Sequence, residues 1–333
     1  MSLLFIPFKS YVNEIGGPST FMINLKDFLI SKSFKFKFNP KSINTTDGIF
    51  FPISYDKFIL SYFRKNNLPI IQRLDGVYYP QKHGNKYISL NQDIKDICFN
   101  YSTYVIFQSE YCKRQCFEIL GILPKDKYSI ICNGTNKKIF YSREYEEKLN
   151  INKKLKLITT GNFRNMDMIE PIILALDSLV KKYEFELTII GPVTNREIIK
   201  LIKDKSYIKH VKKLNLKKIA IYLRESDIFI YSHLNPPCPN SVIEAISCGI
   251  PVVSFDSGSI PELLFFSRDL LASVPKKVFQ EYSEFNPELL QEKIIYAFKN
   301  LRLIKKRAIK YSYLYSFEDS GNKYLKIFNQ LLD

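Results

Sequence analysis

The stretch of residues 227–255 constrains the fold of this 333-residue chain more than any other part of the sequence. It begins with an apolar run short enough to be a buried strand and ends in a second such run at 251–255. Between the two runs a proline-rich loop leads into a helical pattern that starts at Asn240 or Ser241, both good N-caps, and stops at Gly249. The pattern predicts a strand, a helix and a second strand parallel to the first.

The start of this predicted helix is a suitable place for an anion. Free backbone N–H groups and the positive end of the helix dipole favour a phosphate there. Glu244 lies one turn into the helix, where a carboxylate can accept hydrogen bonds from sugar or ribose hydroxyls next to that phosphate. An ordinary crossover of a parallel sheet with a solvated glutamate explains the same pattern, and the two interpretations stay open at this point.

Composition and charge exclude several classes of protein. Hydrophobic residues make up 46% of the chain, a globular value, and the net charge of +16 is spread over both halves and comes mainly from lysine. This argues against a nucleic-acid reader, but it leaves peripheral contact with an anionic membrane open. The six cysteines form no C-x-x-C pair, which favours a reduced, cytoplasmic compartment without structural disulfides or zinc. No run has the length of a membrane span or the pattern of a signal peptide.

Short apolar runs alternate with helical patterns along the whole chain, and a polar stretch at 141–154 interrupts the alternation. We therefore expect an α/β protein with two doubly wound domains in series, each with its ligand crevice at the carboxyl ends of the strands. The expected strands are 3–7, 48–51, 68–72, 104–107, 128–132, 155–160, 185–191, 207–211, 227–231 and 251–255. The expected helices are 16–31, 54–65, 88–100, 109–120, 168–181, 195–204 and 215–225.

Several loops that follow these strands carry residues suited to a site. Gly16 and Gly17 would let the backbone approach a ligand, although a tight turn explains a lone glycine pair equally well. Arg73 and Asp75 follow a strand directly, and a surface salt bridge is the alternative for that pair. The sequence lacks G-x-G-x-x-G, H-E-x-x-H, G-x-S-x-G and the P-loop motif, and none of its three histidines has a partner pattern for a triad or a metal.

Taken in order, these blocks resemble the retaining, nucleotide-sugar-dependent glycosyltransferases of family four, which have the GT-B fold. The resemblance covers nearly the whole chain, and its most specific part is Cys238–Ala245 continued through 249–253. The other blocks that carry it are Gly16–Pro18, Val105–Glu110 with Ile131–Gly134 and Phe140, Gly161–Arg164, and Ser257–Glu262.

The resemblance implies a role for each matching residue. Glu244 would bind the ribose hydroxyls of the donor nucleotide, and Arg164 would offset the charge of the diphosphate leaving group. The backbone around Asn240, Ser241, Gly258 and Ser259 would hold the donor phosphate or sugar, with Gly161 and Glu262 in the adjoining donor loops. Gly16 and Gly17 would bring the N-terminal backbone close to donor and acceptor. Such enzymes need no resident metal or other cofactor, and a UDP- or GDP-sugar would be the donor substrate.

Three departures from the family pattern stand out. The family places an acid eight residues before Glu244, where this chain has Pro236. A glycine–lysine arrangement common after Gly161 is missing, which leaves Arg164 as the nearby cation. Many members carry a histidine where this chain has Arg73–Gly76, so we assign Asp75 to the acceptor side.

The sequence thus predicts a metal-independent retaining glycosyltransferase that moves a hexosyl group to a glycan or lipid-linked glycan. We expect it in the cytoplasm or on the cytoplasmic face of a membrane. Residues 1–145 would form the acceptor-side domain and 150–310 the nucleotide-sugar-binding domain, facing a central cleft. The last helix, about 312–333, would pack back on the first domain, or else on its own. A catalytically silent GT-B scaffold and a GT-B epimerase or phosphorylase are the alternatives.

Overall fold

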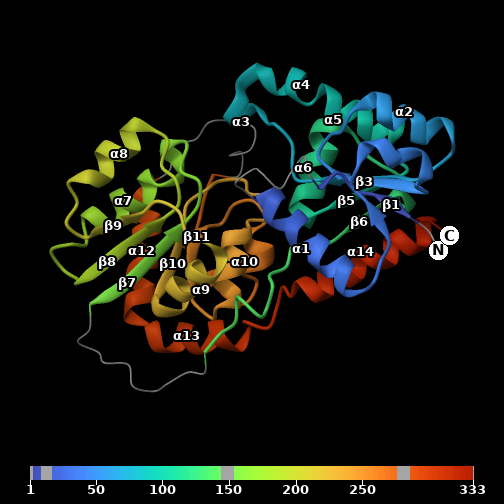
Figure 1. Cartoon of the computed structure of the whole chain (residues 1–333). Helices are drawn as coiled ribbons and strands as arrows, with labels where there is room; N and C mark the ends of the chain where they lie inside the picture. The colour runs from blue at the N-terminus through green and yellow to red at the C-terminus, as the bar shows by residue number, and fades with distance from the viewer. Residues whose placement is uncertain (1–2, 9–16, 144–153, 276–285, 333) are drawn as a thin grey trace. The chain divides into compact units, whose positions relative to one another are not determined.

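The computed structural model describes residues 3–8, 17–143, 154–275 and 286–332. These residues form two compact units, each built on a six-stranded parallel sheet with helices on its faces (Figure 1). Unit 1 contains the described residues up to Gly134 and those from Phe317 on, and unit 2 contains those from Thr135 to Ser316. The prediction of two doubly wound α/β halves is confirmed. The boundary falls before the polar stretch at 141–154, much of which lies outside the described residues.

In unit 1 the strand order is β2-β1-β3-β4-β5-β6, and every pair is parallel. The residues of β3 and β4 are buried throughout. Strand β3 is a continuous apolar run, as buried parallel strands usually are, whereas β4 also buries the polar Gln72 and the charged Arg73. The two-residue β2 was not predicted, because so short a strand has no periodicity to detect. The strands are β1 Leu4–Phe5, β2 Phe36–Lys37, β3 Gly48–Pro52, β4 Ile70–Leu74, β5 Tyr104–Phe107 and β6 Tyr128–Ile130.

The main helices of unit 1 are α1 Gly17–Ser31, α2 Lys57–Lys65, α6 Glu110–Leu120 and α14 Phe317–Leu332, with short helices α3 Pro80–His83, α4 Tyr87–Leu90 and α5 Gln92–Asp96. The helical stretch predicted at 88–100 is observed, but it is divided into α4, α5 and a π-helical turn at Ile97–Tyr101. At the break between α4 and α5, the Asn91 side chain exchanges two hydrogen bonds with the backbone of Tyr78, at 3.0 and 2.7 Å. This tertiary contact has no signature in the local sequence.

Helix α14 packs in unit 1, against α1 and one face of the sheet (Figure 1). The ring of Phe328 meets Phe50 of β3 edge-on, with the centroids 5.2 Å apart. Gly321 allows close approach, because a Cβ there would lie 2.7 Å from the ring of Phe28 in α1. The hydroxyl of Tyr324 accepts a hydrogen bond from Nε of Arg73 at 3.1 Å. The C-terminal segment therefore completes the core of unit 1.

In unit 2 the strand order is β12-β11-β10-β7-β8-β9, again all parallel. The first strand of the unit, β7, lies in the interior of the sheet between β8 and β10. The predicted strand 155–160 is confirmed to the residue. The strands are β7 Leu155–Thr160, β8 Phe185–Ile190, β9 Ile208–Val211, β10 Ile228–Tyr231, β11 Val252–Phe255 and β12 Leu271–Ala272.

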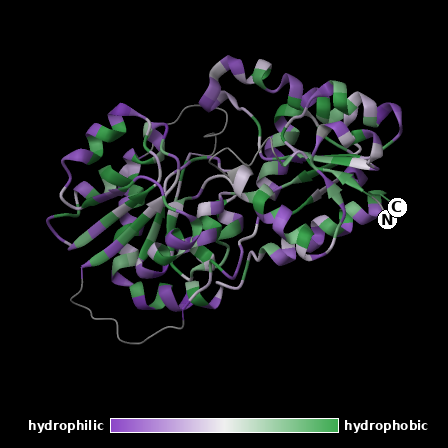
Figure 2. Ribbon diagram, in the orientation of Figure 1, coloured by the Kyte–Doolittle hydropathy of each residue, from purple (hydrophilic) through white to green (hydrophobic). Residues whose placement is uncertain are grey.

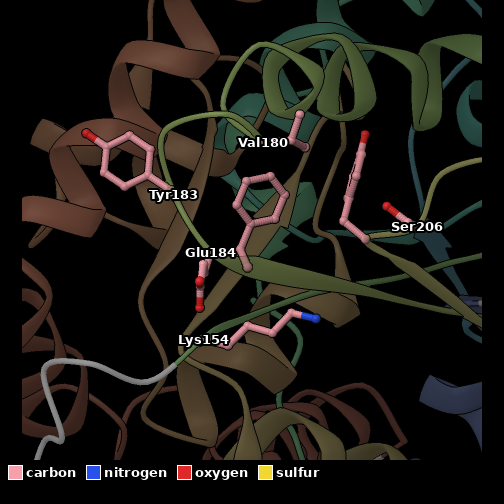
Figure 3. A pocket seen from close by; sticks show the side chains of 7 residues that line it. Lys154, Val180, Tyr183, Glu184 and Ser206 are labelled. Carbon is pink, nitrogen blue, oxygen red and sulfur yellow. The ribbon is translucent and has the colours of Figure 1, made fainter.

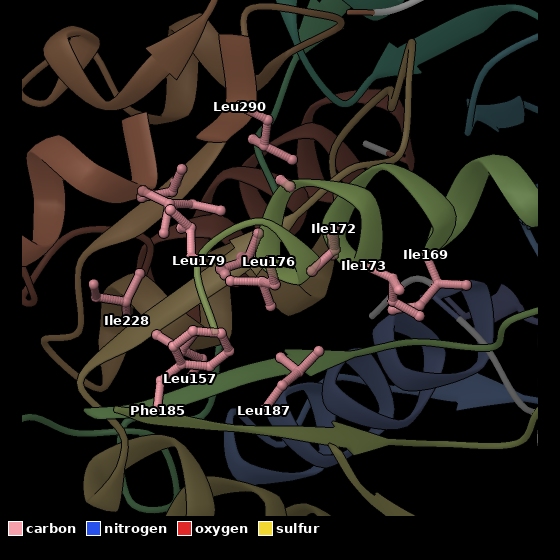
Figure 4. Close-up of a cluster of buried hydrophobic side chains, with 14 of the residues drawn as sticks. Leu157, Ile169, Ile172, Ile173, Leu176, Leu179, Phe185, Leu187, Ile228 and Leu290 are labelled. Atoms are coloured by element: carbon pink, nitrogen blue, oxygen red, sulfur yellow. The ribbon is translucent and has the colours of Figure 1, made fainter. Parts of the chain in front are cut away.

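The helices of unit 2 are α7 Glu170–Asp177, α8 Arg196–Lys203, α9 Leu216–Glu225, α10 Asn240–Ser247, α11 Ile260–Leu263, α12 Pro287–Lys299 and α13 Leu301–Lys310. The main core packs α7 and α12 on the sheet, with Leu157 and Leu187 of the strands against Leu176 and Leu290 of the helices (Figure 4). Figure 2 shows hydrophobic residues along the strands and hydrophilic residues on the outer helix faces of both units.

The contact between Tyr324 and Arg73 predicts a measurable contribution to the stability of unit 1. Arg73 is fully buried, so Tyr324→Phe leaves its Nε–H without this acceptor, and we expect the free energy of unfolding to fall by about 1–3 kcal/mol. Urea denaturation measures the change. Tyr313→Phe, at a residue that is 69% exposed, is the control and should be neutral. Equal midpoints for the two variants would contradict this role of α14.

Candidate functional site

The strand order of unit 2 reverses direction beside β7. The chain goes from β7 to β8 and β9 on one side, then returns to β10, β11 and β12 on the other. In open parallel sheets, ligands bind outside the carboxyl ends of the strands at such a switch point. The loops that leave β7 and β10 start at Gly161 and Ser232, so they define the candidate site.

The loops after β7 and β8 are in close backbone contact. Gly191 has a φ of +132°, and a Cβ there would lie 1.8 Å from the carbonyl oxygen of Gly161, so only glycine fits. The N–H of Phe163 donates to the carbonyl of Pro192 at 2.9 Å, and the Phe163 side chain is fully buried. Arg164 follows this anchor and is exposed. The structure thus places Gly161 and Arg164 in one well-held loop at the switch point.

Arg164 has an amide partner within its own loop. In the orientation of the Asn162 amide that satisfies both groups, its oxygen accepts from Nη2 and Nε of Arg164 at 2.9 and 3.2 Å. This contact leaves the positive charge of the guanidinium uncompensated, so the group keeps its attraction for an anion at the rim of the loop.

His233 is a residue at the switch point that the sequence analysis did not select. Its ring lies 4.6 Å from that of Tyr231 and 6.4 Å from that of Phe163, measured between centroids. A Cβ on Gly161 would be 3.7 Å from its Cε1 atom. Its place at the end of β10 was the available signal, but the strand order that brings it beside β7 cannot be read from the sequence.

The N-cap of helix α10 lies at least one residue before the position that the sequence predicts. The N-cap is Pro239, which has no side-chain hydrogen bond, so the prediction of a cap at Asn240 or Ser241 is wrong. The carbonyl of Pro239 accepts from Val242 at 3.2 Å, as in the first turn of a helix. The backbone N–H of Ser241 has no acceptor within the described part of the chain. An uncapped first turn leaves the helix dipole and this N–H available to an anion.

The end of α10 is as predicted. Gly249 has a φ of +72° and its N–H donates to Ile246, while the N–H of Ile250 donates to Ala245. This pair of bonds is a Schellman motif, the usual glycine stop of a helix.

Glu244 is only 8% exposed and lies within the buried run Val242–Ser247 of α10. In the described part of the chain no residue forms a hydrogen bond or an ion pair with its carboxyl group. Burial raises the pKa of Glu244 to about 8. A buried carboxyl group without a partner is unfavourable for folding and is typical of a site that receives a ligand.

Pro236, which stands where the family has an acid, is held by the loop after β11. A Cβ on Gly258, which has a φ of +64°, would lie 2.3 Å from Cδ of Pro236. The Ser259 N–H donates to the Pro236 carbonyl at 2.9 Å, and Ser257 Oγ accepts from the Asn235 N–H at 2.9 Å. These contacts hold the loop between β10 and α10 against the loop that follows β11.

These contacts correct one expectation. The Ser259 amide was expected to hold the phosphate or sugar of a donor, but it is bonded to Pro236 and its side chain is fully buried. Ser259 thus fixes the loop rather than facing outward. Gly258 beside it and the half-buried Glu262 in α11 remain in the same loop region, and Asn240 lies half-buried in the first turn of α10.

In unit 1, Arg73 and Asp75 stand at the carboxyl end of β4 and form an ion pair. Arg73 also donates to Asn133 at 2.9 Å and lies 3.7 Å above the ring of Phe21. The pKa of Asp75 is raised by burial, against the opposing effects of Arg73 and Gln108. The surface salt bridge considered as an alternative is excluded, because the Arg73 side chain is 1% exposed. Gly17 is the first residue of α1, and Gly16 lies outside the described residues.

A pocket of about 330 Å³ lies at the opposite edge of the unit 2 sheet (Figure 3). Lys154 and Glu184, which line it, directly precede β7 and β8, so it is at the amino ends of the strands. No described helix is long and apolar enough to span a membrane. The described residues also contain no cluster of three or more histidine, cysteine or acidic side chains arranged for a metal.

Comparison with known proteins gives a family match over part of the chain and a fold match over nearly all of it. Residues 142–300 match the family model of glycosyl transferases group 1, which confirms the resemblance seen in the sequence. A comparison with curated protein sequences gave no match.

Solved structures share the fold over nearly the whole chain. Sucrose-phosphate synthase from Thermosynechococcus elongatus has a TM-score of 0.74 at 14% identity, covering 99% of this chain and 98% of that one. HepE from Anabaena, in complex with UDP and glucose, has a TM-score of 0.72 at 13% identity, covering 99% and 100%. WaaG, a glycosyltransferase involved in lipopolysaccharide biosynthesis, has a TM-score of 0.68 at 12% identity, covering 98% and 99%. At these identities the likeness establishes the GT-B fold.

The raised pKa of Glu244 predicts how stability depends on pH. Between pH 4.5 and about 8 the folded chain keeps a proton on Glu244 that the unfolded chain has already released. The contribution of this proton to the free energy of unfolding is therefore full at low pH, falls across that window, and is lost once the pH has risen through about 8. Glu244→Gln has no such titration. The stability of the wild type relative to this variant should fall by up to about 1.4 kcal/mol per pH unit across that window. Urea midpoints measured from acid to alkaline pH test this, and parallel curves would contradict it.

Proposed function

We propose that this chain is a retaining glycosyltransferase that moves a hexosyl group from a nucleoside-diphosphate sugar to a glycan or lipid-linked glycan. The observation that carries the proposal is Glu244, a buried carboxyl group without a partner in the described chain, one turn inside an uncapped helix at the switch point of unit 2. The match of residues 142–300 to group 1 glycosyltransferases supports the same assignment.

Glu244 would bind the ribose of the donor nucleotide. Two neighbouring hydroxyls can donate to one carboxylate, and such charge-assisted hydrogen bonds favour its ionised form. The ribose would therefore supply the hydrogen bonds that Glu244 lacks among the described residues, and binding would lower the pKa of Glu244 from about 8. HepE bound to UDP and to UDP-glucose is a structural precedent for a uridine nucleotide in this fold.

The diphosphate would lie at the start of α10. Asn240 and Ser241 form its first turn, where the dipole and backbone N–H groups attract an anion, and the positive charge of Arg164 stands in the loop after β7. As the bond to the sugar breaks, negative charge develops on the leaving phosphate. These fixed charges would stabilise it without a bound metal. Gly161, Gly258 and Glu262 would border the donor.

Sugar recognition would differ from the family pattern. Pro236 packs on Gly258 and cannot supply the carboxylate that usually meets the sugar. Glu262 or His233, both partly buried near these loops, would provide polar contacts in its place. The same proline motivates the second candidate, a GT-B protein that binds a nucleotide without transferring a sugar.

Unit 1 would hold the acceptor. Asp75 is fixed by Arg73 at the carboxyl end of β4, so its carboxyl group is positioned rather than mobile. The involvement of WaaG in lipopolysaccharide biosynthesis supports a surface glycan or its lipid-linked precursor as acceptor. We propose a cytoplasmic enzyme with peripheral contact at an anionic membrane, in keeping with the net charge of +16.

Nucleotide binding tests the proposal. Isothermal calorimetry with UDP, GDP and ADP should give binding to at least one nucleotide, and Glu244→Ala should weaken it by at least about tenfold, because a charge-assisted hydrogen bond contributes about 1.5–3 kcal/mol. Affinity should rise from about pH 6.5 to about pH 8.5 in the wild type, as the carboxylate forms.

Glu184→Ala is the matched control for this measurement. It removes an exposed carboxylate at the opposite edge of the same sheet and should leave affinity unchanged. Wild-type affinity in Glu244→Ala would sink the donor-site assignment. Binding without any transfer or donor hydrolysis would favour the non-catalytic alternative.

A further inference from the structure

The segment 205–224 of unit 2 is rich in cations and contains no acid. Seven of its residues are lysine or arginine, and the nearest acids along the chain are Asp204 and Glu225 at its two ends. The segment includes β9 and most of α9, together with the loop that joins them. Because all strands of the sheet are parallel, this loop leaves the sheet at the same edge as the loops of the candidate site.

Four of these seven cations have no side-chain partner in the described part of the chain. The other three are engaged, since Lys205 pairs with Asp177 at 2.5 Å. Nζ of Lys209 lies 5.9 Å from the ring centre of Tyr222, and Arg224 donates to a backbone carbonyl. The remaining four are exposed, and we call them the lysine surface: Lys212, Lys213, Lys217 and Lys218.

The lysine surface begins where β9 ends, beside the loops of the candidate site. Lys212 follows Val211, the last residue of β9, whose carbonyl accepts from the N–H of Gly191 at 2.9 Å. The ring of His210 adds a second bond, because its Nε2 donates to the Gly191 carbonyl at 2.9 Å. Gly191 in turn packs against Gly161, at the start of the loop after β7. Since neighbouring strands are about 4.8 Å apart, the end of β9 lies roughly 10 Å from the end of β7.

Two of the four lysines stand where they disfavour the helix that carries them. Lys217 and Lys218 lie in the first turn of α9, whose N-cap Asn215 accepts a hydrogen bond from the Lys218 N–H at 2.9 Å. A positive charge in the first turn opposes the helix dipole, and the nearby Lys212 and Lys213 repel it further. Neutral residues would suit this helix better, so local stability does not account for the lysine surface.

An anion in solution fits this surface better than a lipid bilayer does. The two leucines among the lysines, Leu214 and Leu216, are half-buried, so the stretch 212–218 exposes no apolar side chain that could enter a membrane. The loops after β7 and β11 at the same edge carry exposed acids, Asp167 and Asp256. The unpaired positive charge at this edge is thus concentrated on the β9 side of the candidate site.

We infer that the lysine surface attracts the nucleoside diphosphate of the donor to the candidate site and so speeds its association. The inference rests on the proposed function. A diphosphate is a multivalent anion, and unpaired cations roughly 10–15 Å away attract it before it makes any contact. At that distance they form no hydrogen bond with the bound ligand, so they act on the association rate rather than on dissociation. Their role is thus separate from that of Arg164, which would hold the diphosphate.

The dependence of nucleotide association on ionic strength tests the inference. UDP, GDP and ADP are the probes, calorimetry gives Kd, phosphorus NMR line shapes give koff, and koff divided by Kd is kon. At an ionic strength of about 0.03 M the Debye length is between about 10 and 30 Å, so kon should fall about two- to fourfold in Lys212→Gln/Lys213→Gln. Adding Lys217→Gln and Lys218→Gln should lower kon further, with koff changed by less than about 1.5-fold. At about 1 M salt, where the Debye length is about 3 Å, all kon values should coincide.

Lys181→Gln/Lys182→Gln is the matched control. These two lysines are also adjacent, exposed and without a side-chain partner among the described residues, but they stand before β8, at the opposite edge of the same sheet. The 6 residues of β8, at about 3.3 Å per residue, separate them from the candidate site by roughly 20 Å. The control loses the same net charge, so its kon should stay within about 1.5-fold of wild type at every ionic strength.

All these variants change exposed side chains, and urea midpoints no lower than that of the wild type check that they fold. Equal kon in the fourfold variant and the wild type at low ionic strength, or an equal loss in the control, would overturn the inference alone. Unchanged kon together with weaker binding to phosphatidylcholine vesicles that contain about 30% phosphatidylserine would assign the surface to a membrane instead. Absence of binding by all three nucleotides in the wild type would overturn the proposed function and the inference with it.

Discussion

The pairing of β7 with both β8 and β10 is the constraint on which the arrangement of unit 2 depends. It places the first strand of the unit inside the sheet and brings the loops after β7 and β10 together at one edge. Helix α10 starts at that edge without a side-chain cap and carries Glu244, a buried carboxyl group that lacks a partner in the described chain. A buried carboxyl group without a hydrogen-bond partner is unfavourable to stability, and a ligand with hydroxyl groups would compensate it.

Unit 1 also buries an ionisable side chain, Arg73, but there the side chain has partners within the chain. Arg73 is 1% exposed and Glu244 8%, but the guanidinium of Arg73 is hydrogen-bonded to Asp75, Asn133 and Tyr324. Tyr324 belongs to the last helix of the chain, so the order of the polar groups at the end of β4 depends on a segment far away in sequence. Arg73 has its partners within the chain and Glu244 has none among the described residues, and this contrast separates a structural network from the candidate binding site.

Local patterns predicted much of the fold. The strand 155–160 and the glycine stop at Gly249 follow from the apolar pattern and the backbone freedom of glycine, and both are observed. The N-cap was wrong because asparagine and serine have strong capping preferences, yet the chain uses Pro239 and leaves the first turn open. The bond of the Ser259 N–H to the Pro236 carbonyl joins two loops that are distant in sequence, and no local pattern encodes it. Glu244 was found from its position in a helix, but its burial could be measured only in the structure.

The most direct test of this account is a crystal structure of the chain with the nucleoside diphosphate that it binds. The account predicts the ribose hydroxyls within hydrogen-bonding distance of the Glu244 carboxylate, about 2.5–3.0 Å, and the diphosphate at the first turn of α10 near Arg164. A nucleotide bound elsewhere, with Glu244 still buried and without a partner, would contradict it.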